Sequence, residues 1–274
     1  MKIERKWVFP TKGHVYDVYI RENGSVLAVN ENALLALEEG RADVLYTSTA
    51  GLTCVRPYSG NLLIGSEARK VLILGDEVKE IPLDYGVNSC AVKGEEVAIG
   101  LCCNGMALMK DGKVAWHLET DNHIYSVDWY EDVILGAGFD GFLYAVNREG
   151  KVLHKLPLAE NVNRVKVCGD LIAVGTFEPG QLYVLRYGET GFQMVWGKRD
   201  FFDVRALSWS DNCKYLFVLD WNGTAEVYDS RGNLLLRGMG PRSMESSYWR
   251  NSEIAVGGWG RIELYQFSES NNPL

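Results

Sequence analysis

The sequence predicts an all-β fold, a β-propeller made of seven repeated units, and two observations support this prediction. A pattern of short apolar strands separated by Gly, Asn and Asp turns returns about every 35 to 42 residues from residue 15 onward, as in propeller blades. A helical periodicity of 3.6 residues is nowhere sustained. The first strands of the seven units begin at Val15, Leu52, Val87, Ile124, Val162, Val204 and Met244.

Each complete unit contains four expected strands. In the fourth unit they cover residues 124–129, 133–138, 142–147 and 151–156, and the short turns YED, FDG and REG separate them. Strands of about six residues joined by such turns are typical of an antiparallel meander. The third and sixth units show the same four-part pattern, so we expect four antiparallel strands per blade.

The seventh unit has only three expected strands, at 244–249, 253–258 and 261–266. Residues 3–9 form a further apolar strand ahead of the first unit. Pairing these two ends of the chain would close the ring and leave no large open sheet edge. We therefore expect one domain over residues 1–274, a seven-bladed propeller whose last blade is closed by the N-terminal strand.

Composition agrees with a single globular domain and narrows its partners. Of the 274 residues, 47% are hydrophobic and 29 are Gly, and no linker or low-complexity run interrupts the repeat. A net charge of −8 opposes attraction to nucleic acid and to anionic membranes. No stretch has the length and apolar character of a signal peptide or a transmembrane helix. We therefore expect a cytoplasmic protein that does not bind membranes.

The six cysteines show no pattern typical of a metal site. Cys102 and Cys103 are adjacent, and no CxxC pair lies at zinc spacing from a second pair or a histidine. Since free cysteine behaves as a small apolar residue, we expect all six thiols to be reduced. We expect no metal and no cofactor.

The sixth unit carries a resemblance to a known family. Residues 204–235 resemble a WD-repeat, with Asn222 and Gly223 in place of the usual Asp-Gly and with Tyr228 and Asp229 in place of the closing Trp-Asp. This resemblance implies a propeller and, for cytoplasmic WD-repeat proteins, a protein-interaction scaffold. WD-repeat proteins also act as non-catalytic partners of RNA-modifying enzymes, so the resemblance leaves RNA as an alternative ligand.

The fourth unit resembles a second class of repeats. Residues 138–156 are similar to quinoprotein-like propeller repeats, and residues 111–116 show the Gly-Lys-x-x-Trp ending of that class. No motif for a quinone or its calcium is present. Of the WD-repeat polar tetrad, only His123 and Asp140 are placed to pair within one blade, where we expect a structural hydrogen bond.

Two columns of equivalent positions indicate a binding face at the mouth of the channel. Inner-strand starts and the turns between second and third strands lie on one face of a propeller, so repeated positions form a ring. In the turn column, the last four units place Phe139, Phe177, Trp221 and Trp259. The second residues of the inner strands are polar or aromatic: Tyr16, Thr53, Asn88, Tyr125, Asn163, Arg205 and Glu245.

We therefore expect a non-enzymatic scaffold that binds a protein segment at this mouth. Exposed Trp, Tyr and Arg in one cluster are typical of interaction hot spots, and the arginines could pair with carboxylates of the partner. RNA binding, or a role as non-catalytic subunit of an RNA-modifying complex, is the alternative. A metal-dependent hydrolase or lactonase is a third hypothesis; its nearest candidate residues are Asn88, Asn163, Asp203 and Glu245. The expected partner-binding residues are Tyr16, Tyr125, Phe139, Arg164, Phe177, Arg205, Trp221 and Trp259.

Overall fold

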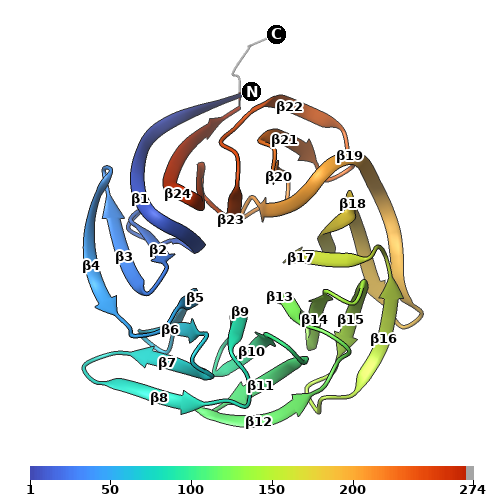
Figure 1. Cartoon of the computed structure of the whole chain (residues 1–274). Helices are drawn as coiled ribbons and strands as arrows, with labels where there is room; N and C mark the ends of the chain where they lie inside the picture. Colours follow the sequence, from blue (N-terminus) through green and yellow to red (C-terminus); the bar gives the residue numbers. More distant parts are fainter. Residues whose placement is uncertain (270–274) are drawn as a thin grey trace.

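The computed structural model describes residues 1–269, and all the regular secondary structure in this part is β-strand. The strands surround a central channel, and all pairs of neighbouring strands in the sheets are antiparallel (Figure 1). The all-β propeller predicted from the repeats is therefore confirmed. The N-terminal strand runs beside the last strand, at the same point of the ring (Figure 1).

Three of the sheets have four strands each. In each of these sheets the strands follow one another in chain order from the channel to the rim (Figure 1). Their outermost strands carry mostly exposed residues, as edge strands at the rim of a ring do. The strands are β5 (Leu52–Tyr58), β6 (Asn61–Ser66), β7 (Lys70–Leu74) and β8 (Val78–Pro82); β9 (Val87–Lys93), β10 (Glu96–Leu101), β11 (Met106–Lys110) and β12 (Lys113–Leu118); and β13 (Ile124–Tyr130), β14 (Val133–Gly138), β15 (Phe142–Val146) and β16 (Val152–Pro157).

Two further sheets have six strands each, because some strands are very long. One sheet contains β23 (Met244–Arg250), β24 (Glu253–Ser268), β1 (Lys2–Ile20), β2 (Val26–Asn30), β3 (Ala33–Glu38) and β4 (Arg41–Thr47). The other contains β17 (Asn161–Cys168), β18 (Leu171–Gly188), β19 (Gly191–Trp209), β20 (Tyr215–Asp220), β21 (Thr224–Asp229) and β22 (Leu234–Met239).

The prediction of seven blades with four strands each is therefore wrong in its count. Counted as continuous hydrogen-bonded sheets, the described residues form five blades. The physical reason is that β1 continues without a break from its pairing with β24 over residues 2–10 into its pairing with β2 over residues 15–20. β19 joins β18 to β20 in the same way. Seven inner strand segments still line the channel, each in contact with the next.

Closure by the N-terminal strand is confirmed. In the register of β1 with β24, Trp7 pairs with Leu264 and Phe9 pairs with Ile262. The rings of Trp7 and Phe9 pack against a buried cluster that includes Ala255, Ile262 and Leu264. The two ends of the chain are thus held together by a hydrogen-bonded ladder and by apolar packing.

The apolar core lies between neighbouring sheets rather than in one central mass. One buried cluster joins β5–β8 to β9–β11 through residues such as Leu63, Val71, Ile99 and Met109. Equivalent clusters recur round the ring. Neighbouring sheets pack face to face through these clusters.

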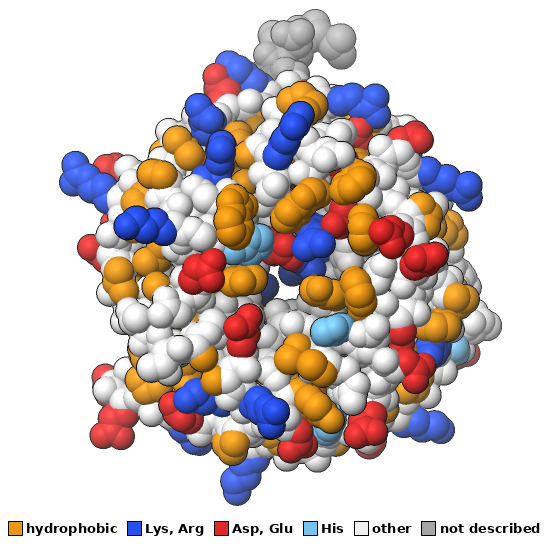
Figure 2. Space-filling view, in the orientation of Figure 1, with side chains coloured by type: hydrophobic (Ala, Val, Ile, Leu, Met, Phe, Trp, Pro, Cys, Tyr) orange, Lys and Arg blue, Asp and Glu red, His pale blue; other side chains and the backbone are white. Residues whose placement is uncertain are grey.

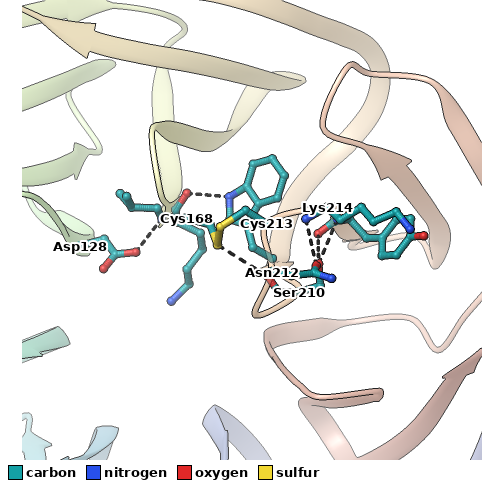
Figure 3. The surroundings of a disulfide bond; sticks show 10 residues. Asp128, Cys168, Ser210, Asn212, Cys213 and Lys214 are labelled. Carbon is teal, nitrogen blue, oxygen red and sulfur yellow. Dashed lines mark hydrogen bonds between the residues drawn. A yellow bond between two sulfur atoms is a disulfide. The ribbon is translucent and has the colours of Figure 1, made fainter.

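The expectation that all six thiols are reduced is wrong for the structure. Cys54 of β5 is bonded to Cys90 of β9, and Cys168 at the end of β17 is bonded to Cys213 in the turn before β20. Their Cα atoms lie 6.1 Å and 5.4 Å apart, distances that a disulfide spans. Figure 3 shows the second bond, whose turn is fixed by the bonds that Ser210 Oγ and the amide of Lys214 donate to Asn212 Oδ1. The first bond joins two neighbouring inner strands, and the second joins the end of an inner strand to the turn that follows the next inner segment.

We predict the thiol count that follows from this pairing. Protein unfolded in guanidinium without reductant should show two reactive thiols, Cys102 and Cys103, and reductant should raise the count to six. A thiol-specific chromogenic reagent measures both values. Six reactive thiols before reduction would contradict the disulfides. Such bonds are typical of oxidising compartments, so the same count tests the cytoplasmic location, which stays a prediction.

Candidate functional site at the channel mouth

A β-bulge occurs at the same place in all seven inner segments, at the position that the sequence analysis assigned to the mouth. The pairing register of each inner segment skips one residue, so that this residue faces no partner across the ladder. A bulge bends the strand and redirects the side chain. The skipped residues are Tyr16, Thr53, Asn88, Tyr125, Asn163, Arg205 and Glu245.

Six of these seven side chains line a central cavity of about 370 Å³ at the mouth; Asn163 is the exception. Figure 2 shows the opening in the middle of one face, with charged side chains inside it and hydrophobic side chains gathered around it. The sequence-based prediction that this column faces the channel is confirmed for these six positions. Arg164, Trp221 and Trp259 also line the cavity.

The turns between second and third strands form a ring around this cavity. In six units, one turn residue donates its backbone N–H to the carbonyl just ahead of the inner strand, at 2.8 to 3.0 Å. These residues are Glu31, Glu67, Cys102, Phe139, Trp221 and Trp259, and Phe177 takes the equivalent place by pairing with Asn161 in the remaining unit. The ring thus has an aromatic half, an acidic arc of Glu31 and Glu67, and one thiol.

The aromatic half extends into pairs of neighbouring rings. Tyr125 and Phe139 have ring centroids 5.2 Å apart, and Phe177 lies 5.9 Å from Phe202. Trp259 is 62% exposed and Phe202 is 53% exposed, large values for aromatic side chains. Sequence reasoning missed Phe202, which lies within the long β19, just ahead of its inner segment, and outside both columns.

Trp259 stands beside a histidine that sequence reasoning also left out of the site. The ring of His14 lies 5.9 Å from that of Trp259 and 4.6 Å from that of Tyr16, measured between centroids. His14 Nε2 lies 3.4 Å from Glu245 Oε2. The exposed aromatic edge is thus in direct contact with the charged groups inside the mouth.

The floor of the mouth is a compact ionic network. Arg205 donates to Asp203 at 2.6 Å and to Glu245 at 2.9 Å, and Arg164 binds the other oxygen of Glu245. Asn163 donates to Asp203 at 2.5 Å. The guanidinium of Arg205 also lies 4.7 Å from the ring centroid of Trp221, within the range of a cation–π interaction. Arg164 and Arg205 are therefore used within the protein.

The protonation of this network follows from burial and from its arginines. Burial alone would raise the pKa of Glu245, but Arg164, the hydrogen bond from His14 and Arg205 outweigh burial and hold that pKa well below its usual range. Burial raises the pKa of Asp203, although Arg205 opposes this shift. Burial also raises the pKa of the Tyr16 hydroxyl, and Glu31, Glu67 and Glu245 raise it further.

The expected pair of His123 and Asp140 does not form. His123 Nδ1 accepts a hydrogen bond from the backbone N–H of Cys103 at 3.0 Å, and Asp140 accepts from the hydroxyl of Tyr144. The reason is that a turn of the preceding sheet places the backbone N–H of Cys103 within hydrogen-bonding distance of His123. Asp140 instead fixes its own turn through the amide of Phe142.

The residues considered for a hydrolase are engaged in structural bonds. Asn88 donates to the carbonyl of Ile124 at 3.2 Å, while Asn163 and Asp203 bind each other. Within residues 1–269, no group of three or more His, Cys, Asp or Glu side chains is placed to hold a metal ion. No helix in that range is long and apolar enough to cross a bilayer.

Comparisons with known proteins identify the fold. No protein-family model matches the chain, and no curated protein matches its sequence. Among solved structures, the WD40 β-propeller domain of Doa1 matches with a TM-score of 0.83 at 15% identity, over 98% of each chain. The chain has a WD40-type β-propeller fold. The propeller of Cps50 (Swd1) from Myceliophteria thermophila matches with a TM-score of 0.82 at 13% identity, over 97% of this chain and 100% of that one.

A third match comes from a larger assembly. A chain in the crystal structure of the Mitotic Checkpoint Complex matches with a TM-score of 0.85 at 12% identity, over 97% of this chain and 95% of that one. Identities this low show a shared fold only. The fold supports the WD-repeat resemblance seen in the sixth unit, and the function has to be argued from the site itself.

Proposed function

We propose that the protein is a non-enzymatic interaction module that binds a segment of a partner protein across the channel mouth. The aromatic half of the turn ring carries this proposal. Phe139, Phe177, Trp221 and Trp259 occupy equivalent positions in four consecutive units, and Trp259 is 62% exposed. The other three are half-buried. Aromatic side chains around a polar cavity combine apolar anchors with hydrogen-bonding groups, as interaction hot spots do.

The surrounding structure supports a preformed site. The anchors stand on backbone positions fixed by the hydrogen bonds of the turn ring, and the ionic floor holds its side chains in place. A rigid surface loses little conformational entropy when a partner binds. Arg164 and Arg205 contribute by supporting Trp221 and the floor, instead of pairing with partner carboxylates as the sequence analysis expected.

The experiment is selection of binders from a displayed library of random short peptides, followed by affinity measurement with wild-type protein and the Trp259→Ala variant. We expect loss of about 2 kcal/mol or more of binding free energy in the variant, with little change in thermal stability, because the side chain is mostly exposed. Calorimetry gives both values.

Trp249→Ala is the matched control, because Trp249 is 3% exposed and packs against Phe267. This change should lower the free energy of unfolding by about 3–5 kcal/mol through the cavity that it leaves. Peptides that bind wild-type protein and the Trp259→Ala variant equally would overturn the assignment of the site. RNA binding is tested in parallel with a single-stranded oligonucleotide, whose affinity would fall steeply with added salt.

A further inference from the structure

The acidic arc of the turn ring begins beside Trp259, because the first and the seventh units are neighbours in the ring. Glu31 and Glu67 are both exposed, and neither forms an ion pair within the described residues. Glu31 Oε1 accepts one hydrogen bond, from the backbone N–H of His14 at 2.7 Å. Glu67 lines the same cavity as Tyr16.

The charges deeper in the cavity largely cancel. Arg56 is paired with Asp17, and Arg164 and Arg205 are paired with Glu245 and Asp203. A seventh group, Lys166, lines both this cavity and the one at the opposite end of the channel, so it lies between them and below the mouth. At the acidic side of the rim, Glu31 and Glu67 are the carboxylates that no basic side chain of the described residues pairs with.

Other charged groups also stand near the rim, among them the exposed Arg69 in the same turn as Glu67. Lys12 is exposed next to Gly13, and the stem of Arg242 lies 3.3 Å from the position that a Cβ of Gly223 would take, beside Trp221. Arg242 therefore belongs to the aromatic side. Glu160 and Glu178 add two further exposed carboxylates to the unit that carries Phe177. The negative groups outnumber the positive ones around the opening.

We infer that the partner segment carries a basic side chain, Lys or Arg, that binds Glu31 and Glu67 while an apolar side chain of the same segment contacts Trp259. The inference rests on the proposed function and adds the chemistry of the partner. His14 connects the two contacts: its ring lies beside those of Tyr16 and Trp259, and its backbone N–H donates to Glu31. A cation there gains charge pairing at the arc and a cation–π contact with an aromatic face.

The test uses peptides from the random library, without any assumption about the natural partner. Those retained by wild-type protein should be enriched in Lys and Arg beside an apolar residue. Replacing the basic residue of a selected peptide by Gln should weaken binding about tenfold, and the Glu31→Gln/Glu67→Gln double variant should weaken the original peptide by a similar factor. The double variant should no longer distinguish the two peptides.

Glu149→Gln is the control, because Glu149 is an exposed carboxylate in the turn between β15 and β16. It should leave the affinity unchanged. Selected peptides that depend on Trp259 but show no basic enrichment and bind the double variant normally would overturn this inference and leave the proposed function intact. Failure of Trp259 dependence would instead overturn the proposed function.

Discussion

Deletion of residues 1–10 should open the ring and lower the melting temperature by about 10 °C or cause aggregation. The deletion removes the part of β1 that pairs with β24 from Lys2 to Pro10 and exposes a long edge of β24. It also removes Ile3, Trp7 and Phe9, three half-buried side chains packed against buried clusters. Together they contribute roughly 3 kcal/mol by apolar burial, and about 1 kcal/mol shifts the melting temperature of a domain this size by 2–4 °C.

A matched pair of point variants separates packing from chain length. Trp7→Ala should lower the melting temperature measurably, because its ring packs against the cluster of Ala255 and Leu264. Val8→Ala should have little effect, because Val8 is 44% exposed on the opposite side of the strand. Scanning calorimetry of the three proteins checks both expectations. A truncated protein that melts like the full chain would show that closure does not stabilise the ring.

The sequence predicted the strands well because their signal is local. In the fourth unit, expected strands at 124–129 and 133–138 match β13 and β14 to within one residue. Gly and Asp turns and alternating apolar residues decide these boundaries within a few residues of chain. The sheet count could not be obtained this way, because it depends on whether hydrogen bonding continues through the bend of β1 and β19.

The disulfides show how a signal can be present in the repeat and still be missed. Cys54 and Cys90 are separated by 36 residues, about one repeat, so they lie in neighbouring inner strands. Asp17 and Ser126 occupy the position of Cys54 in two other units. Asp17 accepts a hydrogen bond from the amide of Val55, and Ser126 Oγ lies 3.2 Å from the carbonyl oxygen of Val165. The disulfide thus replaces a polar contact that other units make to the next inner strand. Comparing columns of neighbouring units, rather than Cys spacing motifs, would have found it.

The sequence predicted only part of the channel mouth. Repeated positions located the aromatic half of the turn ring, since alignment of units needs only the sequence. Alignment could not show that Arg164 and Glu245, which are 81 residues apart, meet in space. Arginine in a candidate site is free for a ligand only if no carboxylate of the fold reaches it first.

Glu245→Ala should be among the most destabilising single substitutions in this protein, with a loss of about 3–5 kcal/mol in the free energy of unfolding. Glu245 is 7% exposed, and its carboxylate is bound by Arg164 and Arg205. Removing it leaves two half-buried guanidinium groups with too little negative charge around them. Glu253→Ala is the control, because Glu253 pairs with the half-exposed Lys6 and should contribute at most about 1 kcal/mol.

The pH dependence of this loss gives a second, independent check. The pKa of Glu245 is lower in the folded protein than in the unfolded chain, so its stabilising contribution is complete above the unfolded value of about 4.3. Below that pH the unfolded chain takes up the proton first, and the contribution falls by about 1.4 kcal/mol per pH unit. Denaturant unfolding of wild-type protein and a Glu245→Gln variant should therefore show a large stability difference at pH 7 that narrows at pH 3. A difference that stays constant between these pH values would mean that the carboxylate is not held ionised by Arg164 and Arg205.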